Sequence, residues 1–117
     1  MKTNTLDAQS DLIFSKLTTK AKEMMGKHFF NSAVFGSRAR GDFAIKSDLD
    51  ICIILNTSEQ VVDDFTYNIG SDVLDIQEDS SIDISIFTIS LDRFLNSEAS
   101  IYKNIKKEGI FWEELNQ

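Results

Sequence analysis

Two aspartates separated by one residue are the side chains of this sequence best suited to chemistry. Asp48 and Asp50 open the apolar run Ile51–Leu55. Side chains of a β-strand alternate between faces, so both carboxylates point the same way, with Cα atoms roughly 6.6 Å apart. Two like charges on an otherwise buried strand repel each other and lose solvation, which a cation between them relieves. Hard oxygen ligands of this kind favour Mg²⁺, with Mn²⁺ as an alternative.

A third carboxylate stands later in the chain, in a segment that alternates like a strand. Asp83 lies in Ser81-Ile82-Asp83-Ile84-Ser85-Ile86-Phe87, an otherwise largely apolar setting. If that strand pairs beside residues 48–55, Asp83 joins the same cluster. Three carboxylates that hold two Mg²⁺ ions leave a positive site, which would attract a polyphosphate.

Phosphate contacts are expected just upstream of the aspartates, at Gly36-Ser37. Glycine lets a phosphate approach the backbone closely, and a serine at the start of a short helix offers N–H and hydroxyl donors. Three basic residues follow within reach in the sequence. They are Arg38, Arg40 and Lys46.

The elements that must position these residues follow from hydrophobic periodicity and from stop signals. The pattern predicts, in order, a helix over about 7–26, a strand over 29–35, a turn and short helix over 37–41, a strand over 48–55, a helix from Ser58 weakened at Gly70, a strand over 82–89, a helix from Ser90 to Lys107 interrupted near Ser97, and an edge segment at 110–112. Strands that alternate with helices indicate an α/β (α+β) fold.

Length and composition set the remaining bounds. The 117 residues predict a single domain over 1–117. The formal charge of −7 disfavours direct nucleic-acid binding, which needs positive charge. The one cysteine, Cys52, excludes an internal disulfide, and the longest apolar run, Ile51–Leu55, is too short to cross a membrane. We therefore expect a cytoplasmic protein without a membrane partner.

The combination of motifs resembles the DNA polymerase beta-like nucleotidyltransferases. Their pattern is Gly-Ser, ten residues, Asp-x-Asp and a later acidic residue. Gly36-Ser37, residues 38–47, Asp48-Leu49-Asp50 and Asp83 match it. The small size and the stretch Gly-Ser-Arg-Ala-Arg-Gly are similar to the minimal nucleotidyltransferase subfamily. The resemblance implies a small mixed sheet with helices packed on one face and a metal site on an open sheet edge.

The resemblance also implies an activity and a partner. Asp48 and Asp50 would hold two Mg²⁺ ions, Asp83 would hold the catalytic one and help deprotonate an incoming hydroxyl, and Gly36 and Ser37 would bind phosphates of a nucleoside triphosphate, ATP above all. The chain would act as the antitoxin of a toxin–antitoxin pair and transfer AMP to a tyrosine of a helical HEPN toxin. The alternative is a non-catalytic antitoxin that covers its partner's active site. A phosphoacceptor receiver domain is disfavoured, because Gly-Ser-Arg follows the first strand where that class needs acidic residues.

The acidity is concentrated in one segment. Residues 57–83 carry no Lys or Arg and eight acids: Glu59, Asp63, Asp64, Asp72, Asp75, Glu78, Asp79 and Asp83. Most are expected on a solvated helix face. The sharper hypothesis is that they meet a basic surface of a partner.

Overall fold

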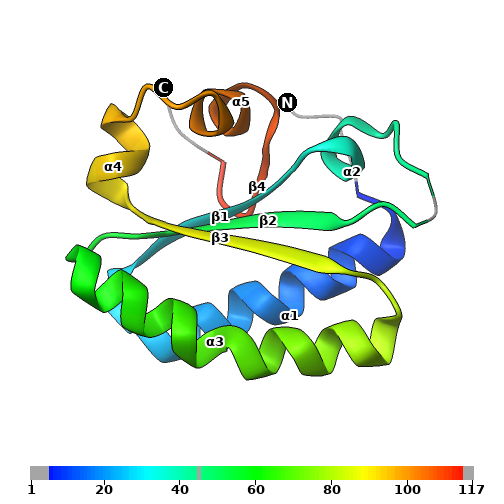
Figure 1. Cartoon of the computed structure of the whole chain (residues 1–117), viewed down its shortest axis with the longest axis horizontal. Coiled ribbons are helices and arrows are strands. Elements are labelled where there is room, and N and C mark those ends of the chain that lie inside the picture. Colours follow the sequence, from blue (N-terminus) through cyan, green and yellow to red (C-terminus); the bar gives the residue numbers. More distant parts are fainter. Residues whose placement is uncertain (1–5, 45, 115–117) are drawn as a thin grey trace.

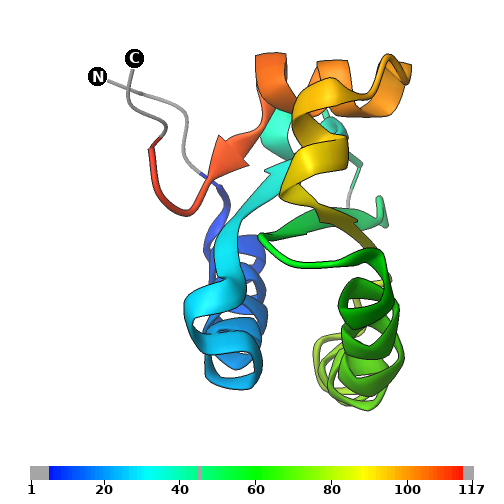
Figure 2. The ribbon, with the colours of Figure 1, turned by 90° about the vertical axis from the view of Figure 1, so that its left-hand side faces the viewer.

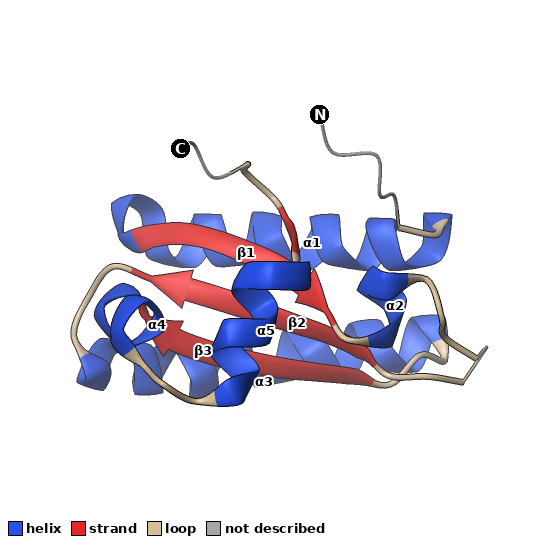
Figure 3. Cartoon of the chain, turned by 90° about the horizontal axis from the view of Figure 1, so that it is seen from above, coloured by secondary structure: helices blue, strands red, loops and turns tan. Residues whose placement is uncertain are grey.

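The protein, described by a computed structural model over residues 6–44 and 46–114, is built on a four-stranded mixed sheet. The strand order is β3-β2-β1-β4. The strands are β1 (Phe29–Phe35), β2 (Leu49–Leu55), β3 (Ile84–Ser90) and β4 (Ile110–Phe111). β1 runs antiparallel to both β2 and β4, whereas β2 and β3 are parallel (Figure 3). The expected pairing of the third strand beside the second is confirmed, and so is the mixed α/β class.

The helices begin and end close to the predicted positions. They are α1 (Ala8–Met25), the 3-10 turn η1 (Gly26–His28), α2 (Ser37–Arg40), α3 (Glu59–Ser80), α4 (Leu91–Asn96) and α5 (Ser100–Glu108). The side chains of Asp7, Ser58 and Ser90 cap α1, α3 and α4 by accepting a backbone N–H from the first turn, which fixes where each helix starts.

Two details of the helices differ from the pattern. α3 runs without a break through Gly70, because Phe65 and Ile69 are buried against the sheet and offset a glycine penalty of about 1 kcal/mol. The last helix is divided near Ser97, as expected, and the C-terminal segment adds the short edge strand β4.

Helices cover both faces of the sheet rather than the one face expected (Figures 1 and 2). α1 and α3 pack on the face of Leu49, Ile51 and Ile53. The opposite face, with Cys52 and Ile54, forms a second core with α4 and α5, whose Phe94 and Ile105 are buried there. β2 is therefore buried on both faces, which explains its dense apolar sequence.

The topology brings three strand ends together. β1 ends at Phe35 where the antiparallel β2 begins, and β3, parallel to β2, begins at the same end. Gly36, Asp48 and Asp83 are the residues just outside these three ends. The fold therefore gathers the sequence motifs at one end of the sheet. Among the described residues, no helix is both long and apolar enough to span a membrane.

Candidate active site

The Asp50 carboxylate lies against the backbone of Gly36. Asp50 is the Cα partner of Phe35, the last residue of β1, so its side chain stands beside the next residue of the neighbouring chain segment. A Cβ placed on Gly36 would overlap Asp50 Oδ2 and would sit 3.4 Å from its Cγ. Gly36 also has φ of +77° and ψ of −157°, a conformation open almost only to glycine. Both the space and the backbone demand glycine at this position.

The charge of Asp48 acts on Asp50. Asp48 is exposed, whereas Asp50 is partly buried in β2. Burial raises the pKa of Asp50, the negative charge of Asp48 raises it further, and the positive charge of Arg40 opposes the shift. The pair is thus a like-charge cluster that is partly withdrawn from water. Such a cluster fits a divalent cation with oxygen ligands.

Asp83 is placed at the same end of the sheet but is exposed. Its backbone carbonyl accepts a hydrogen bond of 2.9 Å from the Leu49 N–H, so the two strand starts are tied together. Within residues 6–44 and 46–114, no group of three or more His, Cys, Asp and Glu side chains is arranged to hold a metal ion. The structure therefore places Asp48 and Asp50 together as a pair. Asp83 lies at the same end of the sheet, one residue before β3 begins.

Ser85 is a site residue that the motif reading missed. It is the Cα partner of Asp50 in the β2–β3 ladder, and its Oγ lies 3.4 Å from Asp48 Oδ2. The alternation of the strand could have indicated it, because Ser85 shares a face with Asp83 and is polar where the core would require an apolar residue.

Gly36 and Ser37 form the start of α2. The Gly36 carbonyl accepts hydrogen bonds from the N–H groups of Ala39 and Arg40, both at 3.1 Å, so the short helix starts directly at the end of β1. Ser37 is half-buried. Ser37 follows Gly36, which lies against the Asp50 carboxylate. The Gly-Ser pair and the aspartate pair therefore belong to one site.

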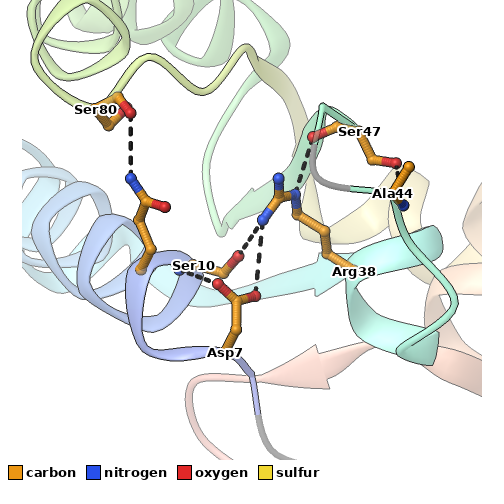
Figure 4. Close-up of polar contacts among 7 residues, drawn as sticks. Asp7, Ser10, Arg38, Ala44, Ser47 and Ser80 are labelled. Atoms are coloured by element: carbon orange, nitrogen blue, oxygen red, sulfur yellow. Dashed lines mark hydrogen bonds and ion pairs between the residues drawn. The ribbon is translucent and has the colours of Figure 1, made fainter.

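The three basic residues expected at phosphates have different surroundings. Arg40 is exposed: its Nε donates to Asp42 at 3.2 Å and its Nη1 lies 3.5 Å from Glu108, and these carboxylates raise its pKa. Lys46 is exposed as well. Arg38 is 4% exposed, and its guanidinium is bonded inside the protein (Figure 4). The structure thus gives Arg38 a buried setting among protein groups, unlike the other two.

Comparison with protein families assigns the chain to one family. Residues 17–112 match the family model of the nucleotidyltransferase domain. This match spans most of the sequence, and the chain belongs to the nucleotidyltransferase domain family. A comparison with curated proteins found no significant match.

Solved structures share the fold. A candidate nucleotidyltransferase from Sulfolobus solfataricus superposes with a TM-score of 0.57 at 18% identity, over 97% of this chain and 93% of that one. A toxin–antitoxin with AMP-PNP gives 0.52 at 12% identity, over 86% and 73%. A mutant of the MntA–HpeT toxin–antitoxin gives 0.50 at 12% identity, over 93% and 75%. At these identities the similarity concerns the fold.

Replacing Gly36 by Ala should destabilise the protein and displace Asp50. The positive φ alone costs about 1–3 kcal/mol, and the overlap with the carboxylate adds to it. Gly41→Ala is the control for a positive φ without a steric overlap: Gly41 has φ of +86° and ψ of 4°, in the left-handed helical region, and open space around a new Cβ, so its cost should be smaller. Urea unfolding midpoints give both costs.

A double-mutant cycle isolates the contact with Asp50. In an Asp50→Ala background, Gly36→Ala should cost about 1 kcal/mol less than in the natural sequence, whereas the cost of Gly41→Ala should not change. An equal cost of Gly36→Ala in both backgrounds would show that the Asp50 carboxylate is not what excludes a side chain at position 36.

Asp50→Asn should stabilise the metal-free protein at neutral pH. The folded state raises the pKa of Asp50, so the ionised carboxylate is less favourable when folded than when unfolded. Asp50 therefore favours folding most at low pH, and its contribution is lost as pH rises through the folded pKa. Thermal unfolding should show a midpoint higher by a few degrees at pH 7, and no gain below pH 3, where the carboxyl is protonated in both states.

Asp63→Asn, at an exposed acid of α3, is the control and should leave the midpoint nearly unchanged. Added Mn²⁺ should reverse the order, stabilising the natural protein more than Asp50→Asn. A variant that is less stable than the natural protein at pH 7 without metal would contradict the assigned repulsion.

Proposed function

We propose that this protein is a Mg²⁺-dependent nucleotidyltransferase that moves AMP from ATP to a hydroxyl group of a partner protein. The observation that carries the proposal is the Asp48–Asp50 pair set against Gly36-Ser37 at one end of the sheet, in a chain of the nucleotidyltransferase domain family. The pair supplies carboxylate oxygens, the ligands that hard divalent cations prefer. A bound cation would also relieve the repulsion between the two negative charges.

Each site residue has a proposed role. Asp48 and Asp50 hold the cations, and Asp83 completes the carboxylate set from the start of β3. Gly36 and Ser37 bind phosphate oxygens at the start of α2. Arg40 and Lys46 are exposed cations on the same segment and compensate phosphate charge. Arg38 is left out of these contacts because its guanidinium is enclosed by other groups.

The proposed transfer is an in-line displacement at the α-phosphorus. A hydroxyl oxygen of the acceptor forms a bond to this phosphorus, the bond to the oxygen bridging the β-phosphate breaks, and pyrophosphate leaves. Asp83 takes the proton of the hydroxyl. Asp48 and Asp50 would hold divalent cations, which would supply stabilisation of the charge that develops on the attacking and leaving oxygens.

An antitoxin role is proposed on two supports. The first is the resemblance of the Gly-Ser-Arg-Ala-Arg-Gly stretch to minimal nucleotidyltransferases, which act on HEPN toxins. The second is that two solved structures with this fold are toxin–antitoxins, one of them with AMP-PNP. We propose a tyrosine of a HEPN toxin as the acceptor. We place the pair in the cytoplasm, which is reducing and suits the single, buried Cys52.

Asp48→Asn combined with Asp50→Asn should abolish labelling of the partner by ATP in the presence of Mg²⁺. Neither amide replaces the anionic oxygens that the cations need, so the rate should fall by at least about 10³-fold. Intact-mass analysis of the co-expressed pair measures it as the loss of added AMP units. Glu23→Gln and Glu98→Gln together, at exposed acids outside α3 and outside the site, form the control with equal charge change. Labelling by the site variant at the natural rate would refute the assignment.

The alternative is that the chain neutralises its partner by covering the partner's active site. The acidic residues of 57–83 favour it, because seven of the eight are exposed and α3 carries most of them. Neutralisation that survives the double substitution at Asp48 and Asp50 would support this alternative.

If α3 meets a basic surface, affinity for the partner should fall several-fold when NaCl is raised from about 0.05 M to about 0.5 M, because exposed charges are screened. Association kinetics should show the loss mainly in the on-rate. Affinity that does not change with salt would exclude a charge-driven contact through α3.

A further inference from the structure

Arg38 is a buried charge at the centre of a small network beside the site (Figure 4). Its Nε donates to the Ser47 carbonyl at 2.9 Å, and its Nη1 donates to Ser10 Oγ at 2.9 Å. Nη1 also lies 3.7 Å from Asp7 Oδ1, and the guanidinium packs 4.6 Å from the centroid of the Phe43 ring. One side chain thus joins the start of α1 to the segment that leads into β2.

The start of α1 is itself organised around this charge. Asp7 caps the helix by accepting the Ser10 N–H at 3.1 Å. Burial raises the pKa of Asp7, whereas the hydrogen bonds from Ser10 and the charge of Arg38 lower it. The lowering effects are together larger, so this pKa lies below its usual value. An ionised Asp7 and a buried guanidinium compensate each other, which lets Arg38 remain in the interior.

The Ser47 carbonyl is the backbone group next to Asp48. Ser47 also closes a turn, with its N–H donating to the Ala44 carbonyl and its Oγ accepting the Ala44 N–H, both at 3.0 Å. On the other side of Asp48, the Leu49 N–H donates to the Asp83 carbonyl. The Asp48 side chain is exposed, and its hydrogen bond to Ser85 is long at 3.4 Å. Its position therefore depends on backbone anchors at residues 47 and 49.

We propose that Arg38 is a positioning residue, which fixes Asp48 for metal binding by holding the Ser47 carbonyl from the start of α1. The proposal rests on the assignment of Asp48 and Asp50 as metal ligands. This role replaces the expected contact of Arg38 with phosphate, because the Nε and Nη1 groups of the guanidinium donate to Ser47 and Ser10. Lysine cannot reproduce this geometry, because it lacks the planar fork that reaches two acceptors.

Two variants test the proposal at different strengths. Arg38→Lys keeps the charge and loses the fork. Ser10→Ala keeps Arg38 and removes its α1 acceptor. The matched control is Ser32→Ala, because Ser32 is also fully buried and also makes one buried hydrogen bond, of 2.7 Å to Thr18, between α1 and β1.

The first readout needs no activity. Amide exchange followed by NMR should accelerate at Leu49 relative to Ile51 of the same strand, at least about threefold, in Arg38→Lys and in Ser10→Ala. Ile51 pairs with Val34 and not with the control position Ser32. Ser32→Ala should change both amides in proportion. Affinity for Mn²⁺ alone, measured by titration without nucleotide, should weaken several-fold in the first two variants and not in the control.

Kinetics separate positioning from phosphate contact. A positioning role predicts that kcat falls about 10–100-fold in Arg38→Lys, because small misplacements are costly, whereas KM for ATP changes less than about twofold. A rise in KM with kcat preserved would overturn the proposal in favour of phosphate binding. Equal behaviour of Ser10→Ala and Ser32→Ala in every readout would overturn it in favour of a structural role only.

Failure of the proposed function gives a different pattern. If the natural protein binds Mn²⁺ but transfers no nucleotide, the transferase proposal fails, and the exchange and Mn²⁺ results still decide the role of Arg38. If exchange at Leu49 is unchanged in an active protein, the anchor is refuted and the transferase proposal stands.

Discussion

The contact between the Asp50 carboxylate and the Gly36 backbone is the constraint on which the site depends. It follows from the β1–β2 register, which pairs Asp50 with Phe35 and so places the carboxylate beside the next residue of β1's chain. Because Gly36 has no Cβ, it can lie beside the carboxylate and adopt a positive φ, and the chain turns directly from β1 into α2. A single register therefore sets the turn, the start of the short helix and the position of one carboxylate, and a slip by one residue would lose all three.

The site contains an electrostatic repulsion between Asp48 and Asp50, and the packing of the core offsets its cost. Asp50 is partly withdrawn from water beside Asp48, and both effects raise its pKa. The strand that carries it is held by two cores, with Leu49 and Ile51 on one face and Cys52 and Ile54 on the other. A strand buried on both faces resists the local rearrangement that would relieve the repulsion. The charges that act on Asp50 are those of Asp48 and Arg40, so the acidity of α3 is a separate feature of the surface.

Local patterns in the sequence were sufficient to predict the helices, the strands and the main motif. They could not predict contacts between residues that are far apart in the sequence. The strands and the caps at Asp7, Ser58 and Ser90 are local features that periodicity and residue type report. The surroundings of Arg38 differ from those of Arg40 and Lys46, with which the motif groups it. Local patterns could not show this difference, because its partner Ser10 is 28 residues away and only the packing of α1 brings it near. Coverage of the second sheet face was missed for the same kind of reason, since it depends on where α4 and α5 fold back. The metal ligands themselves remain a prediction of the motif.

The segment from 41 to 48 shows why such a site needs an anchor outside its own strands. Its described residues belong to no helix or strand, so no ladder of hydrogen bonds fixes them. Asp48 lies at the end of this segment, one residue before β2 begins. A carboxylate held only by a strand end would share the fraying of that end, whereas a carbonyl bonded to a buried guanidinium at the preceding residue limits it. The first turn of α1, far away in the sequence, is in this way part of what determines where Asp48 stands.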